Sequence, residues 1–252
     1  MLKQPNGKSF CLLMNKIYNP DFVRELFDSM SKSYERMNYI TSFGFSERWR
    51  RSCVQQANLK PGDHVADLMT GMGECWTTII PQIGSTGQLT ALDFSKEMLL
   101  DANRRKQKYA NHKIEILLQD VFNNTLQENS MDCVISGFGI KTFSREQLTD
   151  LAKEVLRVLK PGGRFSFIDV SVPKSWVLRS LYMFYLKKVI PVLGKLFLGN
   201  PENYKMLGVY TENFQNAEQC AMIFRSQGLI TTYRTHFFGC ASGITGHKPE
   251  GR

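Results

Sequence analysis

Several features that would narrow the function of a chain of this size are missing here. The six cysteines form no C-x-x-C pair, and the four histidines show no metal-ligand spacing. Paired cysteines and clustered histidines mark zinc sites and disulfide frameworks, so neither is expected. The first 20 residues also lack a charged segment followed by an uninterrupted apolar stretch, as a signal peptide would have. We therefore expect a cytoplasmic protein with reduced thiols and no metal.

Acidic residues are scarce relative to basic ones. The chain has 23 Asp and Glu against 32 Lys and Arg, which leaves a net charge of +9. Such a balance favours anionic surfaces, whether nucleic acid or lipid head groups. However, no basic run alternates with aromatic residues of the kind that stack on bases. Basic clusters such as Arg48, Arg50 and Arg51 are instead expected on solvated helix faces.

The segment 65–73 (VADLMTGMG) is the most informative stretch. A hydrophobic run that contains one acid, Asp67, ends in the turn Thr70-Gly71-Met72-Gly73. Glycine tolerates positive φ and lets the backbone approach a ligand closely. A second apolar run ends in Asp93 and Phe94. In an open α/β sheet, a glycine turn after the first strand and an acid after the second place a nucleotide at the carboxyl ends of the strands.

The identity of the nucleotide follows from what is absent from this turn. Dinucleotide binding requires a third glycine, but Gly73 is followed by Glu74, Cys75 and Trp76. A carboxylate in the first helical turn would repel a pyrophosphate, whereas it tolerates a cationic, phosphate-free nucleoside such as S-adenosylmethionine. The alternative is a glycine turn with no ligand.

Further strand ends strengthen the case for a nucleoside. Asp120 and Val121 follow a third apolar run, and a fourth leads into Ser136, Gly137 and Phe138. Acids at three successive strand ends resemble the class I S-adenosylmethionine-dependent methyltransferases over residues 60–170. The resemblance implies a Rossmann-like, doubly wound, mostly parallel α/β sheet with helices on both faces. The expected cofactor-binding residues are Asp67, Thr70, Gly71, Gly73, Asp93, Phe94, Asp120, Val121, Ser136 and Gly137.

The alternation of apolar runs and periodic segments predicts one structural domain. Residues 1–58 would form a loose arm (1–19) and a helical cap, with helices at 21–37 and 46–58. Residues 59–252 would form the core, with 171–212 as a helical insert that covers the substrate. The stretch 175–198 is apolar and aromatic, but charged residues interrupt it. It predicts a cap helix over an apolar cavity, or a helix in a membrane interface.

The flanking regions resemble a narrower family, the ubiquinone/menaquinone-biosynthesis C-methyltransferases. The likeness rests on residues 23–30 (VRELFDSM), 34–38 (YERMN), 42–51 (SFGFSERWRR) and the insert 189–195 (VIPVLGK). This family methylates a ring carbon of a prenylated hydroquinone or a similar phenol. The resemblance implies an S-adenosyl-L-methionine donor, an S-adenosyl-L-homocysteine product and an aromatic cap over the acceptor. The expected substrate-binding residues are Phe27, Met37, Asn38, Phe138, Tyr182 and Tyr185.

Two departures fall where the family would read its acceptor. The family's Arg-Asn pair after strand four is Lys141-Thr142 here, and Ile244 stands where a histidine is usual. Lysine keeps the charge but loses the planar fork of arginine. We expect Lys141, with a pKa lowered by burial, or Tyr34 to take the acceptor's proton. A surface lysine and a helix-packing tyrosine are the alternatives.

The function predicted is therefore methyl transfer from S-adenosylmethionine to an apolar or aromatic small molecule or lipid, at a ring carbon of a quinol- or phenol-like compound. An N- or O-methyltransferase acting on a lipid head group or secondary metabolite is the alternative, and a non-enzymatic binding module is a third. No nucleic-acid partner is expected, since no Asn/Asp-Pro-Pro-Tyr motif follows strand four. The pattern allows peripheral membrane contact and a homodimer.

Overall fold

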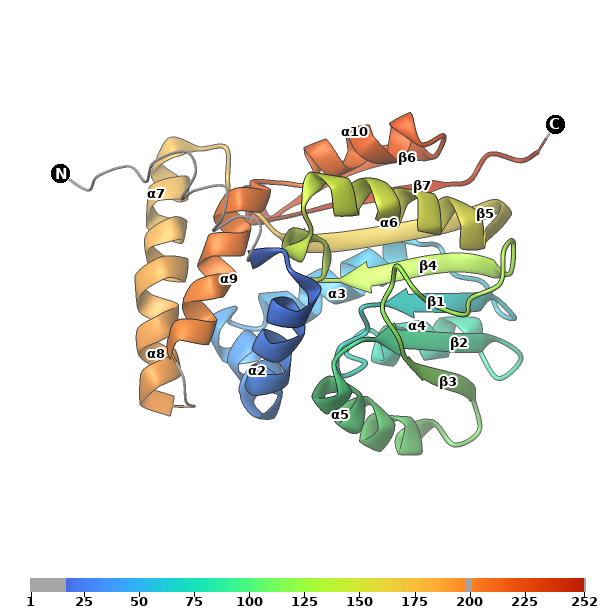
Figure 1. The fold of residues 1–252 in the computed structure, drawn as a ribbon, viewed down its shortest axis with the longest axis horizontal. Coiled ribbons are helices and arrows are strands. Elements are labelled where there is room, and N and C mark those ends of the chain that lie inside the picture. Colours follow the sequence, from blue (N-terminus) through green and yellow to red (C-terminus); the bar gives the residue numbers. More distant parts are fainter. Residues whose placement is uncertain (1–16, 198–200, 252) are drawn as a thin grey trace.

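The computed structural model describes residues 17–197 and 201–251, and a seven-stranded sheet lies at its centre (Figure 1). The strand order is β3-β2-β1-β4-β5-β7-β6. The first five strands pair in parallel, and β7 pairs antiparallel with both β5 and β6. The strands are β1 (His64–Leu68), β2 (Gln88–Asp93), β3 (Lys113–Leu118), β4 (Met131–Gly137), β5 (Leu159–Val170), β6 (Ile230–His236) and β7 (Ala241–His247). The predicted Rossmann-like, mostly parallel sheet is confirmed.

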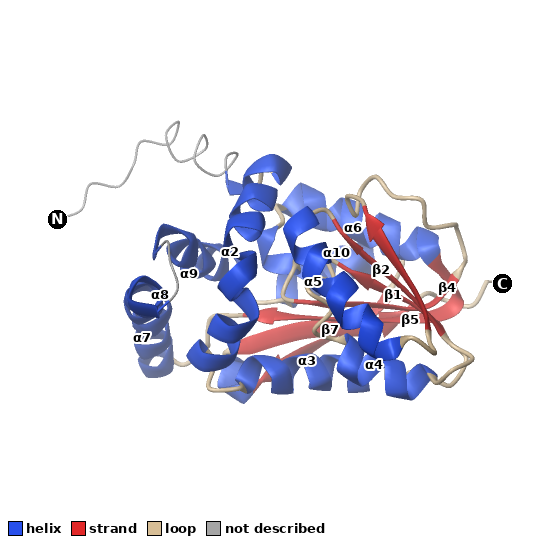
Figure 2. Cartoon of the chain, turned by 90° about the horizontal axis from the view of Figure 1, so that it is seen from below, coloured by secondary structure: helices blue, strands red, loops and turns tan. Residues whose placement is uncertain are grey.

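Helices cover both faces of this sheet (Figure 2). One face carries α3 (Phe45–Gln56), α4 (Trp76–Ile83) and α5 (Lys96–Lys106), which ends in the short η1 (Gln107–Tyr109). The other carries α6 (Arg145–Val158) and α10 (Glu218–Ser226). The α6 helix begins at a capping box in which Ser144 and Gln147 satisfy each other's backbone N–H groups. Short 3-10 turns, η2 (Ile140–Thr142) and η4 (Phe237–Gly239), follow β4 and β6.

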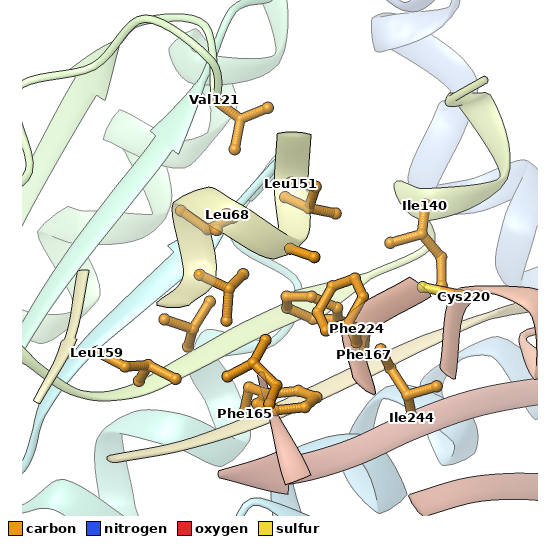
Figure 3. Packing of buried hydrophobic residues seen from close by; sticks show 14 of the residues in the cluster. Leu68, Val121, Ile140, Leu151, Leu159, Phe165, Phe167, Cys220, Phe224 and Ile244 are labelled. Atoms are coloured by element: carbon orange, nitrogen blue, oxygen red, sulfur yellow. The ribbon is translucent and has the colours of Figure 1, made fainter. Parts of the chain in front are cut away.

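The core on the α6–α10 face is aliphatic and aromatic. Phe165 and Phe167 of β5 pack on Phe224 of α10, with ring centroids 5.4 and 5.7 Å apart (Figure 3). Ile244 of β7 lies in the same cluster and is fully buried. It is not among the residues that line the two cavities described below, and the role expected at position 244 stays a prediction.

A helical cap lies beyond the carboxyl ends of the strands, at the end of the molecule opposite the C-terminus (Figures 1 and 2). Its N-terminal part is α2 (Pro20–Thr41). The rest follows β5: α7 (Trp176–Phe184), the π-helical η3 (Tyr185–Val189), α8 (Ile190–Phe197) and α9 (Pro201–Phe214). Leu26 and Met30 of α2 share a buried cluster with Leu186, Ile190 and residues of α9. The cap is thus one apolar unit assembled from two distant parts of the sequence.

The arm predicted at 1–19 lies mostly outside the described residues, but its last part is packed rather than loose. Ile17 is buried, and its carbonyl accepts a 2.5 Å hydrogen bond from the Tyr210 hydroxyl. The Asn19 side chain accepts from the N–H groups of Asp21 and Phe22, which caps α2.

The five cysteines of the described residues are free and buried. Four of them, Cys53, Cys75, Cys133 and Cys240, lie in the core on the α3–α4 face, and Cys220 lies on the other face. Burial raises the pKa of the Cys53 thiol to about 12. The described part of the chain also holds no cluster of metal-ligating side chains and no helix long and apolar enough to cross a membrane.

Candidate active site

A cavity lies where the carboxyl ends of β1 to β4 meet α2. Its walls include the glycine turn, the ends of β2 and β3, and the start of the segment after β4. Parallel strands bring these segments together because their carboxyl ends share one edge of the sheet. Of the predicted cofactor-binding residues, those on the wall are Thr70, Gly71, Asp93, Phe94, Asp120, Val121 and Gly137.

Asp93 connects the end of β2 to the glycine turn. One carboxylate oxygen accepts from the Gly71 N–H at 2.8 Å, and the other accepts from the Ser95 N–H at 2.9 Å. Burial raises the pKa of Asp93 to about 6, although these N–H donors lower it. The backbone at Gly71 is left-handed, with φ +59°, so the close approach of turn and carboxylate depends on glycine here.

Asp120 forms the opposite rim of the cavity. It follows β3, and one carboxylate oxygen accepts from the Phe122 N–H at 2.8 Å. Gln119 and Val121 line the wall beside it. An acid with free acceptor capacity next to apolar side chains suits a purine ring that carries an exocyclic amine.

Asp67, Gly73 and Ser136 do not line this cavity. The Asp67 carboxylate lies under the glycine turn and accepts from the Thr70 hydroxyl at 2.5 Å and the Trp76 indole N–H at 3.0 Å. Burial raises the pKa of Asp67 to about 7. Gly73 has φ +77°, and a Cβ there would lie 2.7 Å from the Trp76 ring. These residues shape the turn from beneath, and Ser136 is buried with an unpaired hydroxyl.

A second cavity, lined mainly by aromatic and aliphatic side chains, adjoins the first. Its walls come from α2, α3, α7, η3 and η4, and Tyr34 and Phe138 line both cavities. Phe138 has φ +71°, which turns its ring into the boundary between them. The predicted substrate residues Asn38, Tyr182 and Tyr185 are on this wall. Phe27 lines the first cavity instead, and Met37 is buried inside the cap cluster.

Lys141 and Asp169 form a buried ion pair at the wall of the apolar cavity. The ammonium lies 2.9 Å from Asp169 and donates to the Phe138 carbonyl at 2.8 Å. The exposed fractions of the two side chains are 3% and 0%. Asp169 also accepts from the Lys141 and Val170 N–H groups. Lys141 is therefore neither a surface lysine nor a free amine, and the surface alternative is wrong.

Tyr34 lies between the two cavities and is buried. Burial raises the pKa of its phenol, while the nearby charges of Lys141 and Arg50 and a hydrogen bond with Asn38 lower it. The net effect is upward, so Tyr34 keeps its proton at neutral pH.

A second buried ion pair was not predicted. Arg50 of α3 lies 2.9 Å from Glu74, and its guanidinium carbon is 4.7 Å from the centre of the Phe138 ring. Both side chains line the first cavity. The expectation that Arg50 lies on a solvated helix face is wrong, because its partner 24 positions later draws it inward. The Glu74 carboxylate balances this cation next to the glycine turn.

The first cavity fits S-adenosylmethionine by the chemistry of its walls. Two carboxylates at adjacent strand ends suit a ribose and an adenine amine, a glycine turn allows close approach, and no phosphate-binding helix terminus is needed. Glu74 and Arg50 neutralise each other at the wall, so the acids of the cavity that are not in an ion pair are Asp93 and Asp120. With the strand order described above, this site defines a class I S-adenosylmethionine-dependent methyltransferase.

Comparisons with known proteins agree with this class and identify the family within it. The family model described as "ubiE/COQ5 methyltransferase family" matches residues 14–248, and the chain belongs to this family. A demethylmenaquinone methyltransferase of Staphylococcus saprophyticus is 32% identical over 227 residues, which cover 90% of this chain and 96% of that protein. One from Geobacillus sp. (strain WCH70) is 30% identical over the same shares of the two chains.

Solved structures share the fold at low sequence identity. A SAM-dependent methyltransferase from Aquifex aeolicus has a TM-score of 0.60 at 19% identity, and the match covers 87% of this chain and 97% of that one. A putative S-adenosyl-L-methionine-dependent methyltransferase from Methanococcus maripaludis has a TM-score of 0.56 at 18% identity, over 100% and 99% of the chains. The enzyme is a methyltransferase that uses S-adenosyl-L-methionine and acts on a small molecule.

Proposed function

We propose that this methyltransferase acts on an apolar, aromatic small molecule or lipid and transfers the methyl group to a ring carbon of a quinol- or phenol-like compound. The observation that supports it is the aromatic cavity, which meets the donor cavity at Tyr34 and Phe138. An aromatic ring held there would face the donor across a short boundary, as methyl transfer requires. The similar proteins named demethylmenaquinone methyltransferases favour the same acceptor class.

The ion pair suggests how the acceptor is activated. S-adenosylmethionine supplies an electrophilic methyl group, and carbon methylation of a phenol requires negative charge on the acceptor oxygen. Lys141 uses two donor positions on Asp169 and the Phe138 carbonyl, which leaves one N–H for that oxygen. We propose that the acceptor loses its phenol proton to water and binds as the phenolate, that Lys141 stabilises this anion, and that Tyr34, which keeps its proton, donates a second hydrogen bond. Once the methyl group has moved from sulfur to the ring carbon, that carbon would lose its own proton to water and the oxygen would regain one, with S-adenosylhomocysteine as the neutral leaving group. In this proposal neither residue is the base that removes the acceptor's proton, which was the role expected from the sequence.

The cofactor half of the proposal concerns the strand ends. Asp93, Asp120, Thr70 and the glycine turn would hold the donor, and Asp67 would act by fixing Thr70 and Trp76 beneath it. Calorimetry with S-adenosylmethionine tests this: Asp93→Ala should abolish the heat of binding. The matched control is Asp101→Ala, an acid on α5 that pairs with the exposed Arg104 and lies outside the donor cavity. Equal binding by both variants would refute the assignment of Asp93.

The acceptor half is tested with a labelled methyl donor and cell extract separated into lipid and polar fractions. Label should enter the lipid fraction and lie on a ring carbon by mass spectrometry. Label on nitrogen or oxygen would instead favour a head-group or secondary-metabolite methyltransferase, which the Lys141-Thr142 departure keeps as the second candidate. An acceptor with a lipid tail resides in a bilayer, so peripheral contact with a membrane belongs to this proposal.

A further inference from the structure

The outer face of the insert carries an apolar stripe that nothing in the described residues covers. It consists of Trp176, Val177, Leu181, Phe184 and Val192, and the exposed fractions of Trp176 and Phe184 are 79% and 63%. Positions 177, 181 and 184 lie on one side of α7, since residues three and four apart share a helix face. The stripe runs along α7 and α8, the outermost helices of the cap in Figure 1. Large side chains in such an arrangement mark an interaction surface.

All charged side chains in the insert sequence that carries this stripe are basic. Residues 170–201 contain no Asp or Glu but include Lys174, Arg179, Lys187, Lys188 and Lys195. Lys174 and Lys187 pair with Glu218 and Glu212. Among the described residues, Arg179, Lys188 and Lys195 have no acidic partner within ion-pair distance. An apolar stripe flanked by unbalanced cations is complementary to an anionic lipid surface.

The aromatic cavity adjoins this stripe at Leu181, which is exposed and also lines the cavity. Phe43, which is 81% exposed, stacks on Tyr185 at 6.2 Å, and both line that cavity together with Leu181. Phe237 also lines it and contacts the exposed Phe238. Exposed aromatic and aliphatic side chains therefore connect the stripe to the cavity wall, which also includes polar residues such as Asn38 and Ser42.

We propose that the α7–α8 face docks on an anionic lipid bilayer, with Trp176 and Phe184 inserted among the acyl chains and Arg179, Lys188 and Lys195 at the head groups. The acceptor would then pass from the bilayer into the aromatic cavity past Phe43 and Leu181. This inference rests on the proposed function for the nature of the acceptor, but the docking itself can be measured without turnover.

The test is flotation of the full chain with vesicles of phosphatidylcholine alone, or with about a third phosphatidylglycerol. The wild-type chain should float only with the anionic vesicles and should be released by high salt. Each cation contributes about fivefold to such binding, so Arg179→Glu/Lys188→Glu/Lys195→Glu should weaken it by on the order of 100-fold or more. Trp176→Ser/Phe184→Ser should weaken it as well, without a change in charge.

The matched control is Lys60→Glu/Lys113→Glu/Lys153→Glu. These exposed lysines lie before β1, on β3 and on α6, outside the cap. Both triple variants lower the net charge from +9 by six, to +3, so a specific surface predicts that only the cap variant loses binding. Equal loss in both variants would overturn the proposal in favour of non-specific charge attraction.

Other outcomes would also overturn it. Flotation with neither vesicle would remove the bilayer as the partner. Concentration-dependent self-association that Trp176→Ser/Phe184→Ser abolishes would assign the stripe to a second copy of this chain. None of these substitutions falls on a cavity wall, so calorimetry with S-adenosylmethionine should be unchanged in every variant. Loss of docking with intact donor binding therefore separates failure of this inference from failure of the proposed function.

Discussion

Removal of the Lys141 charge tests the buried ion pair at the wall of the aromatic cavity. Breaking a buried ion pair by deleting one partner costs about 3–5 kcal/mol of stability. When the ammonium is lost, the Asp169 carboxylate still accepts hydrogen bonds from two backbone N–H groups, that of Lys141 at 2.9 Å and that of Val170 at 2.7 Å. Lys141→Met should therefore fall near the lower limit, about 3 kcal/mol. Asp169→Ala leaves the ammonium with only the Phe138 carbonyl, so its cost should approach about 5 kcal/mol.

Urea unfolding followed by circular dichroism measures these costs. The double variant should lose less than the sum of the single losses, because neither charge is then left unpaired. The control pair is Lys153 and Asp150, which lie 2.9 Å apart on α6 but are exposed. Lys153→Met should cost about 0.5 kcal/mol or less. If Lys141→Met costs no more than this control, the reasoning about the buried pair is wrong.

Four further predictions follow from the same geometry. Affinity for S-adenosylmethionine should fall about tenfold per pH unit below about 6, where Asp93 gains its proton, and Asp93→Asn should flatten this profile in calorimetry. The raised pKa of Asp67 means that the folded state binds the Asp67 proton more tightly than the unfolded state does. The contribution of Asp67 to the free energy of unfolding therefore falls as pH rises from 3.8 to about 7. The urea midpoint of Asp67→Asn should lack this dependence on pH. Gly73→Ala places a Cβ 2.7 Å from the Trp76 ring at φ +77°, and should cost roughly 2 kcal/mol or more, seen as a lower Tm. Tyr34→Phe should lower kcat by about tenfold while donor binding is unchanged; a change in donor binding alone would contradict its placement toward the acceptor.

The sheet and most of its helices could be predicted because their signals are local. Apolar runs that end in acids located β1, β2 and β3, and helical periodicity located α2 and α3. The face of the sheet to which the Asp67 side chain points could also have been predicted from the sequence. Side chains alternate along a strand, so Asp67 shares a face with Val65, which packs on the α3–α4 side where Trp76 lies.

Other parts of the site depend on contacts that no local pattern encodes. Nothing in the sequence around Arg50 marks it as buried, since its burial depends on Glu74 and the Phe138 ring. Likewise, the family resemblance placed Phe27 and Met37 at the substrate, but it could not show that Phe27 lines the donor cavity and that Met37 is buried inside the cap. The antiparallel position of β7 between β5 and β6 is set by packing of distant strands.

The accessibility of the buried cysteine thiols reports whether the helical layers of this protein are packed on the sheet. Because Cys53, Cys75 and Cys133 lie beneath one set of helices and Cys220 beneath the other, an alkylating reagent can reach these four thiols only when the respective layer separates from the strands, whereas Cys240 borders the aromatic cavity. Raised pKa values also keep these groups as unreactive thiols in the native state. Alkylating reagents should therefore spare these four thiols in the working enzyme and modify them in chains that have begun to unfold, one layer at a time.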